Sequence, residues 1–122
     1  MIKGKTARRT FGDAAESFVA SHLQQHGFAI CEQNYQKMYG EIDIIARKKD
    51  IITFVEVKVR RACVEHMPAI VTPTKQKKIA RVAREYMARN GLHTAICRFD
   101  VALVSGDEGA FKISYIENAF VG

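Results

Sequence analysis

Four charged side chains interrupt two runs of strand-forming residues within residues 40–60. Glu41 and Asp43 lie in the first run, and Glu56 and Lys58 lie in the second. Their neighbours are mainly isoleucine and valine, and a charge buried among such residues costs free energy unless another group compensates it. A divalent cation would do so, because Mg²⁺ prefers carboxylate oxygens and water as ligands. The pattern predicts a metal site, and cross-strand salt bridges are the alternative.

The two runs are predicted to form a hairpin around the four-residue turn RKKD, residues 47–50. This turn would place Glu41 opposite Glu56 and Asp43 opposite Phe54, and residues directly opposite each other share a face of the sheet. Because side chains alternate along a strand, the four charged side chains would then meet on one face. The hairpin is therefore expected to gather them into a cluster.

Such a cluster suits the hydrolysis of phosphate esters. Bound Mg²⁺ or Mn²⁺ would neutralise the acids, polarise a phosphoryl oxygen and lower the pKa of a bound water. Lys58 follows Glu56 by two residues, so its side chain is placed to orient that water or, as the neutral amine, to deprotonate it.

The remaining elements must position this hairpin. Apolar spacing predicts a first helix over residues 13–26, with Asp13 and Glu16 as a capping box, and a second helix from Thr72 to Asn90. Further strands are expected over residues 28–31, 41–46, 51–60, 95–104 and 110–116. The predicted fold class is α/β, with a central mixed β-sheet flanked by helices in the order αβββαββ.

Length and composition limit the class of protein. The 122 residues, 48% hydrophobic and 26% charged, predict one globular domain over residues 1–122, with residues 1–11 as a flexible basic arm. The chain contains neither an apolar run of about 20 residues nor a secretory signal, so a cytoplasmic location is expected. Its three widely spaced cysteines encode neither a disulfide framework nor a zinc ribbon, and we expect them to be buried thiols.

The net charge of +6 is concentrated in two places. One is the first ten residues, and the other is the second helix, where six cations between Lys75 and Arg89 accompany only Glu85. Such clusters attract polyanions, although a solvated surface is the alternative interpretation. The residues predicted to contact nucleic acid are Lys75, Gln76, Lys77, Lys78, Arg81 and Arg60.

The spacing of the acids resembles a known signature. Asp43, twelve intervening residues and then Glu56-Val57-Lys58 resemble the D…(D/E)xK motif of the restriction-endonuclease-like nuclease superfamily. The first helix, with Glu16, is similar to that of archaeal Holliday-junction resolvases. Over nearly its whole length the chain is similar to the bacterial YraN family of predicted endonucleases. The matching segments are GDAAE, QNY, GEIDIIA, FVEVKVR, TKQKKI, RFDV and ENAF.

The resemblance implies a role for each matching residue. Asp43, Glu56 and the carbonyl of Val57 would bind Mg²⁺ or Mn²⁺, and Lys58 would position or activate water. Glu16 would be an auxiliary acid, and Glu41 could replace it. Gln76 resembles a polar residue that contacts substrate in related nucleases.

The predicted function is therefore a metal-dependent endonuclease that acts on DNA, with branched or damaged DNA as candidate substrates. The alternative is a nucleic-acid-binding protein that retains the nuclease fold without cutting. One active site cannot cut both strands in a single binding event, so a homodimer with twofold symmetry would suit this activity.

Overall fold

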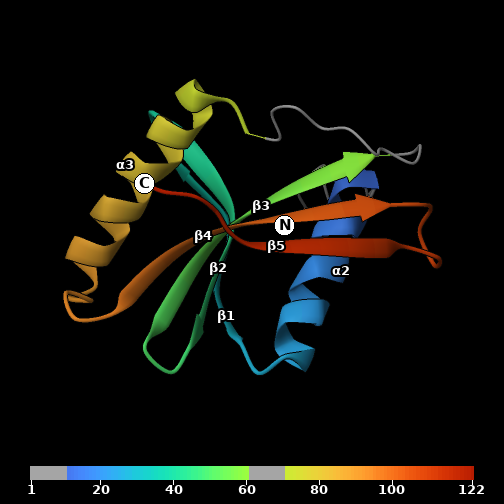
Figure 1. The fold of residues 1–122 in the computed structure, drawn as a ribbon, viewed down its shortest axis with the longest axis horizontal. Helices are drawn as coiled ribbons and strands as arrows, with labels where there is room; N and C mark the ends of the chain where they lie inside the picture. Colours follow the sequence, from blue (N-terminus) through green and yellow to red (C-terminus); the bar gives the residue numbers. More distant parts are fainter. Residues whose placement is uncertain (1–10, 61–70) are drawn as a thin grey trace, which may run out of the picture.

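The computed structural model describes residues 11–60 and 71–122 of the chain (Figure 1). The elements are α2 (Phe11–Gln25), β1 (Ala29–Lys37), β2 (Gly40–Lys48), β3 (Ile51–Arg60), α3 (Pro73–Arg89), β4 (Ile96–Ser105) and β5 (Lys112–Phe120). This order confirms the predicted αβββαββ arrangement.

The five strands form one sheet in the order β1-β2-β3-β4-β5. Neighbouring strands are antiparallel except for β3 and β4, which are parallel. Parallel neighbours need a crossover connection, and α3 lies within it. Helix α2 covers one face of the sheet and α3 the other (Figure 1). The predicted mixed sheet between helices is confirmed.

Helix α3 begins where its sequence predicts. Thr72 is its N-cap, with a side chain that accepts a hydrogen bond from the backbone N–H of Lys75, and Pro73 occupies the first turn. Its buried stripe consists of Ile79, Ala80, Val82, Ala83 and Tyr86, at helical spacing. Within the described residues, neither helix is long and apolar enough to cross a membrane.

Each face of the sheet has its own apolar core. The α3 side includes Ile42, Phe54 and Val101, and the α2 side includes Ile44 and Val55. Strands covered on both faces carry few polar residues, because each face must exclude water. The acids on β2 and β3 are therefore exceptional in their setting.

The β2–β3 hairpin is tighter than predicted. Only residues 49 and 50 form the turn, and Lys48 pairs with Ile51. Lys49 adopts a φ of 55°, which favours a two-residue hairpin turn. β2 therefore continues two residues further than the predicted RKKD loop allows, whereas β3 begins at Ile51 as predicted.

This turn changes the register of the acids. Ile45, not Asp43, pairs with Phe54, so that predicted pair is wrong. The pairing of Glu41 with Glu56 is also wrong, because the ladder ends at the pair of Ile44 and Val55, one residue before Glu56. A shift of two residues preserves the faces within the paired residues 44–48, because side chains alternate there with period two. The alternation breaks before this segment, since Ile42 and Ile44 pack in the cores of opposite faces. The expectation that these acids lie near one another does not depend on the incorrect pairs.

Two smaller predictions also need correction. Helix α2 begins at Phe11, so Asp13 lies inside its first turn instead of capping it, and the predicted capping box is wrong. Phe11, the last residue of the predicted arm, is helical, whereas the rest of the arm and Cys63 lie outside the described residues. Cys31 and Cys97 are free thiols but are exposed, not buried.

Candidate metal-binding active site

The β2–β3 ladder opens at Asp43. Its last pair joins Ile44 to Val55, and beyond it the Asp43 carboxylate accepts a hydrogen bond of 2.8 Å from the backbone N–H of Val57. The N–H and C=O of one strand residue point to the same side. The Val57 carbonyl therefore points to the β2 side of β3, the side on which the Asp43 carboxylate lies.

Glu56 adds a second acid to this opening. Its residue is only 4% exposed, whereas Asp43 is half-buried. Burial raises the pKa of Asp43 to about 7, and the charge of Glu56 contributes further to this rise. The hydrogen bond from Val57 opposes the shift. The two carboxylates thus repel each other in a setting that favours an added cation.

Two lysines approach Glu56 from different elements. The Nζ atom of Lys58, on β3, lies 3.7 Å from Oε2 of Glu56. The Nζ atom of Lys75, in the first turn of α3, lies 2.6 Å from the same oxygen. Lys58 therefore lies beside Glu56 at the acid cluster. Lys75, which the sequence groups with surface cations, lies in the acid cluster.

The two candidate auxiliary acids occupy different positions. Glu16, on α2, is half-buried. Its charge also raises the pKa of Asp43, by less than burial or the charge of Glu56 does. Glu41 is exposed and accepts a hydrogen bond of 3.0 Å from Gln36. Because the capping box is wrong, it no longer accounts for a glutamate at position 16. Of the two, Glu16 acts on the pKa of Asp43, whereas Glu41 acts on that of Lys75.

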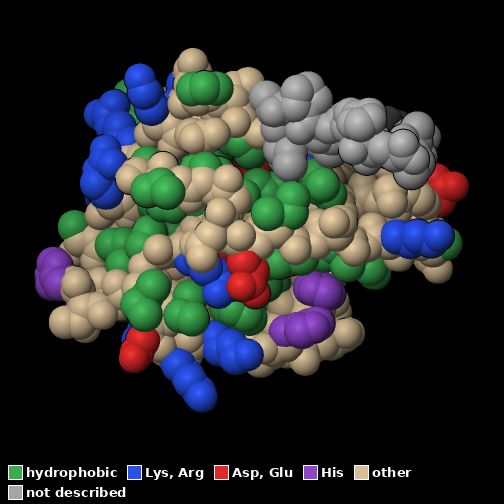
Figure 2. All heavy atoms as spheres, viewed as in Figure 1, with side chains coloured by type: hydrophobic (Ala, Val, Ile, Leu, Met, Phe, Trp, Pro, Cys, Tyr) green, Lys and Arg blue, Asp and Glu red, His purple; other side chains and the backbone are tan. Residues whose placement is uncertain are grey.

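The exposed part of α3 forms a basic surface. Lys77, Lys78 and Arg81 are all exposed, and Lys and Arg side chains gather over α3 in Figure 2. The guanidinium carbon of Arg81 lies 3.9 Å from the ring centre of Tyr39, and the Tyr39 hydroxyl donates a hydrogen bond to Glu85. The hairpin between β1 and β2 therefore adds an aromatic side chain to this surface.

Gln76 and Arg60 make contacts within the chain. The side-chain amide of Gln76 donates a hydrogen bond of 2.8 Å to the carbonyl of Val71, just before α3. Arg60 donates one of 3.1 Å to the carbonyl of Val59. Both remain candidates for nucleic-acid contact, but Gln76 also holds the start of α3.

A groove lies between the start of α3 and the start of β2, beside Lys75 and the basic surface. One part is lined by Glu41, Lys75 and Lys78, and an adjoining part extends to Tyr39. Gly40 lines both parts, and a Cβ added there would lie 3.3 Å from Cβ of Lys78. Glycine at this position therefore lets α3 pack closely against the start of β2, beside the acids.

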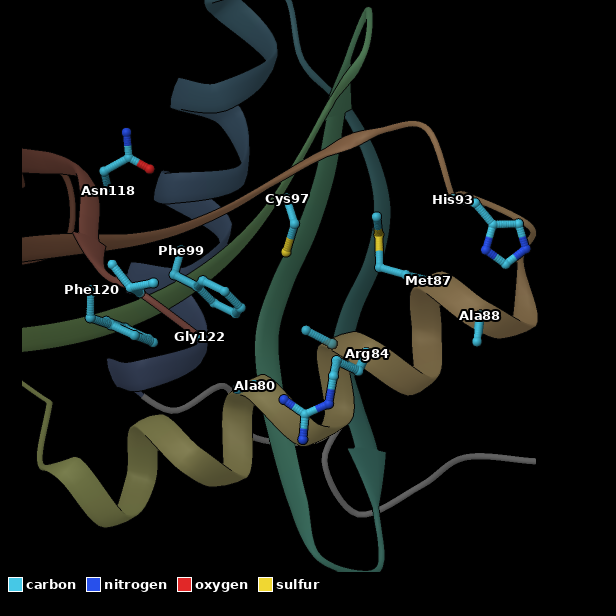
Figure 3. A pocket seen from close by; sticks show the side chains of 12 residues that line it. Ala80, Arg84, Met87, Ala88, His93, Cys97, Phe99, Asn118, Phe120 and Gly122 are labelled. Carbon is cyan, nitrogen blue, oxygen red and sulfur yellow. The ribbon is translucent and has the colours of Figure 1, made fainter.

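The apolar hollow in Figure 3 is a separate feature. Its volume is about 510 Å³, and it lies between α3 and the strands β4 and β5. Its lining includes Met87, Phe99 and Phe120 and none of the acids discussed above. The hollow therefore has no part in the metal site.

We call the place where β2 and β3 separate, with Asp43, Glu56 and Val57, the fork. Its oxygens suit a hard cation. Across residues 11–60 and 71–122, no three His, Cys, Asp or Glu side chains are grouped closely enough to hold a metal ion. The available set is instead two carboxylates, Asp43 and Glu56, and the Val57 carbonyl. Mg²⁺ usually takes one or two carboxylates and completes its shell with water and substrate phosphate. This donor set fits Mg²⁺ or Mn²⁺.

The comparisons identify relatives along nearly the whole chain. Residues 15–104 match the model of Uncharacterised protein family UPF0102. A UPF0102 protein of Alkaliphilus metalliredigens is 45% identical over 114 residues, which cover 92% of this chain and 98% of that protein. One from Syntrophus aciditrophicus is 40% identical over 121 residues, covering 98% and 95%. The predicted resemblance to the YraN family is confirmed.

A solved structure has the same fold. It is Hjc of Archaeoglobus fulgidus, a Holliday junction resolvase from an archaeal hyperthermophile, with a TM-score of 0.56. The alignment covers 84% of this chain and 72% of that chain, at 18% sequence identity. At this identity the likeness establishes the fold alone, and it confirms the predicted restriction-endonuclease-like class.

Proposed function

The chain belongs to Uncharacterised protein family UPF0102, and we propose that it is a metal-dependent nuclease that hydrolyses phosphodiester bonds in DNA, branched DNA included. One observation carries the proposal. The Asp43 carboxylate and the Val57 backbone meet where β2 and β3 separate, beside the buried Glu56. The fold shared with a resolvase supports the choice of DNA as substrate, as an analogy.

Each residue at the fork has a task in this proposal. Asp43, Glu56 and the Val57 carbonyl would hold Mg²⁺ or Mn²⁺. When bound, this cation would supply charge neutralisation and a water of lowered pKa. Lys58, whose Nζ atom lies 3.7 Å from Oε2 of Glu56, would orient the attacking water as the ammonium, and only its neutral amine form would accept the proton of that water. Glu16, on α2, would be an auxiliary acid that adds negative charge beside Asp43 for the cation.

The basic surface would hold the substrate. Lys78 lines the groove, and Lys77 and Arg81 are exposed on the same helix. Lysine and arginine attract phosphate without reading sequence, so binding would be strongly salt-dependent. Replacement of Lys77, Lys78 and Arg81 together should reduce the slope of log affinity against log salt by about 3, because each removed phosphate contact lowers it by about 1.

A nuclease assay tests the activity directly. Purified protein is incubated with linear, nicked and four-way-junction DNA in Mg²⁺, Mn²⁺ or a chelator. Cleavage should require the cation and should disappear in Asp43→Asn. Asp50→Asn is the matched control, because Asp50 is an exposed acid in the β2–β3 turn. Equal cleavage by the wild type and Asp43→Asn would remove the assignment of the site.

The assay also separates the alternative function. A protein that binds all three DNA forms with a steep salt dependence but cuts none of them in either cation is a binding module. The basic surface supports that alternative by itself, whereas the acids at the fork support hydrolysis.

A further inference from the structure

Lys75 and Lys58 share one carboxylate oxygen but hold it differently. Lys75 lies 2.6 Å from Oε2 of Glu56, a direct ion pair, whereas Lys58 lies 3.7 Å from it. The Glu56 side chain is 5% exposed and that of Lys75 is 41% exposed. One end of the pair is thus buried with the acids, and the other has access to solvent.

The start of α3 fixes the point from which the Lys75 side chain extends. Its backbone N–H donates to Oγ1 of Thr72 at 3.2 Å, and the side chain of Gln76 donates to the carbonyl of Val71. Lys75 also lines the groove with Lys78. A lysine side chain is a flexible four-carbon stem with a compact charge. From this fixed point its ammonium can reach either the acid cluster or a ligand in the groove.

We propose that Lys75 is an internal counter-ion of Glu56 that a divalent cation displaces, and that the displaced ammonium then binds a phosphate of the nucleic acid. The inference rests on the proposed metal site and adds a coupling to it. Lys75 and a divalent cation compete for the same oxygen of Glu56, because both satisfy its charge. Metal loading therefore makes one more cation available to the substrate.

Linkage makes the coupling reciprocal. If cation binding frees Lys75 for phosphate, phosphate binding must favour the cation by the same factor. Without a metal ion at the acid cluster, the protein would then bind DNA through α3 with one phosphate contact fewer, that of Lys75. The consequence is a preference for assembling cation and DNA together at the site.

The first measurement is cation affinity without DNA. Mn²⁺ binding is followed by calorimetry and by the shift in melting temperature for the wild type, Lys75→Met, Lys75→Arg and Lys77→Met. Lys77 is the matched control, an exposed lysine on the same helix. Lys75→Met should bind Mn²⁺ more tightly by about 5- to 150-fold, the usual range for coupled binding events. Lys75→Arg keeps the charge and should stay near the wild type, as should Lys77→Met.

The second measurement is the salt dependence of binding to a four-way junction, with and without Ca²⁺. Lys75→Met should leave the slope unchanged without Ca²⁺ and lower it by about 1 with Ca²⁺. Lys77→Met should lower it by about 1 in both conditions. Comparing the variants under each condition cancels the effect of Ca²⁺ on the DNA itself.

The outcomes separate this inference from the proposed function. If Mn²⁺ binds the wild type and not Asp43→Asn, but Lys75→Met matches the wild type in affinity and in both slopes, the counter-ion role is overturned and the metal site stands. If the wild type binds no Mn²⁺, the metal site and the inference fail together. Tighter Mn²⁺ binding in Lys75→Met, with the cation-dependent loss of slope, supports the inference.

Discussion

Asp100 on β4 and Asp43 on β2 are acids in the same sheet, and their surroundings are opposite. Asp100 is fully buried and accepts hydrogen bonds from four groups. The donors are the Thr53 hydroxyl, the Arg98 guanidinium, the Tyr115 hydroxyl and the Asn118 N–H. Asp43 accepts one hydrogen bond, from the backbone of Val57. The charges that act on Asp43 include those of two acids, Glu56 and Glu16.

The difference separates an acid that stabilises the fold from one suited to a cation. Donors around Asp100 replace the water that it loses, and they connect β3, β4 and β5. Burial and the hydrogen bond to Asp100 raise the pKa of Tyr115, so this hydroxyl remains a donor. Around Asp43, nearby carboxylates leave negative charge that protein donors do not fully neutralise.

The same substitution at both acids tests the comparison, and the largest effect is expected at Asp43. Asp43→Asn should reduce metal-dependent cleavage by about 10³-fold, or about 4 kcal/mol in activation free energy, because a metal ion supplies several kcal/mol of charge stabilisation. Its melting temperature should not fall. Initial rates at saturating Mg²⁺ measure the effect. A rate within about threefold of the wild type would show that metal-dependent cleavage does not need the Asp43 carboxylate.

Asp100→Asn should act on stability instead. Removing one partner of a buried ion pair costs about 3 kcal/mol. The other partner here, Arg98, would keep only the exposed Glu117, at 3.8 Å. Chemical denaturation measures the free energy of unfolding. Asp107→Asn, at an exposed position in the β4–β5 connection, is the control and should change it by less than about 0.5 kcal/mol. A neutral Asp100→Asn would contradict the structural role.

The raised pKa of Asp43 predicts an unusual pH dependence. The folded protein binds a proton at Asp43 up to about pH 7, whereas the unfolded chain releases it near its ordinary value of 3.8. The folded state therefore holds more protons between these values, and its stability falls as pH rises from about 4 to about 7. The loss should be about 2 kcal/mol after allowance for the remaining exposure.

Asp43→Asn should remove this component, and Mn²⁺ should offset it in the wild type. Unfolding curves at pH 4, 5.5 and 7 compare the two proteins in a chelator and in Mn²⁺. Parallel pH profiles for the wild type and the variant would show that Asp43 titrates normally.

Glu16 should give the smallest effect. Glu16→Gln keeps the shape of the side chain but removes its charge, and an uncharged amide is a poor ligand for Mg²⁺. We expect about a tenfold loss of cleavage, or about 1.4 kcal/mol, with stability within about 0.5 kcal/mol of the wild type. Glu41→Gln, at an exposed acid, is the matched comparison. A larger loss in Glu41→Gln would make Glu41 the third acid of the site.

Much of the architecture is legible in the sequence because it depends on local patterns. Thr72 followed by Pro73, with apolar residues at helical spacing, marks α3 within a residue of its start. The alternation along residues 51–60 places Glu56 and Lys58 on one face, and this holds whatever the register of the hairpin. The acids, their order and the family follow from such patterns.

Tertiary structure decided what lies next to those acids. The turn consists of residues 49 and 50 alone, so Lys48 and not Ala46 pairs with Ile51. The residues RKKD by themselves did not show that the turn would be this short. The crossover through α3 brought Lys75 to Glu56, although nothing in the spacing of the helical lysines distinguishes Lys75 from Lys77. Residue types and short-range spacing determine which groups are available, whereas contacts between distant segments depend on packing of the whole chain. The sequence by itself therefore identified the acids, and only the folded chain showed that Lys75 is the lysine that pairs with Glu56.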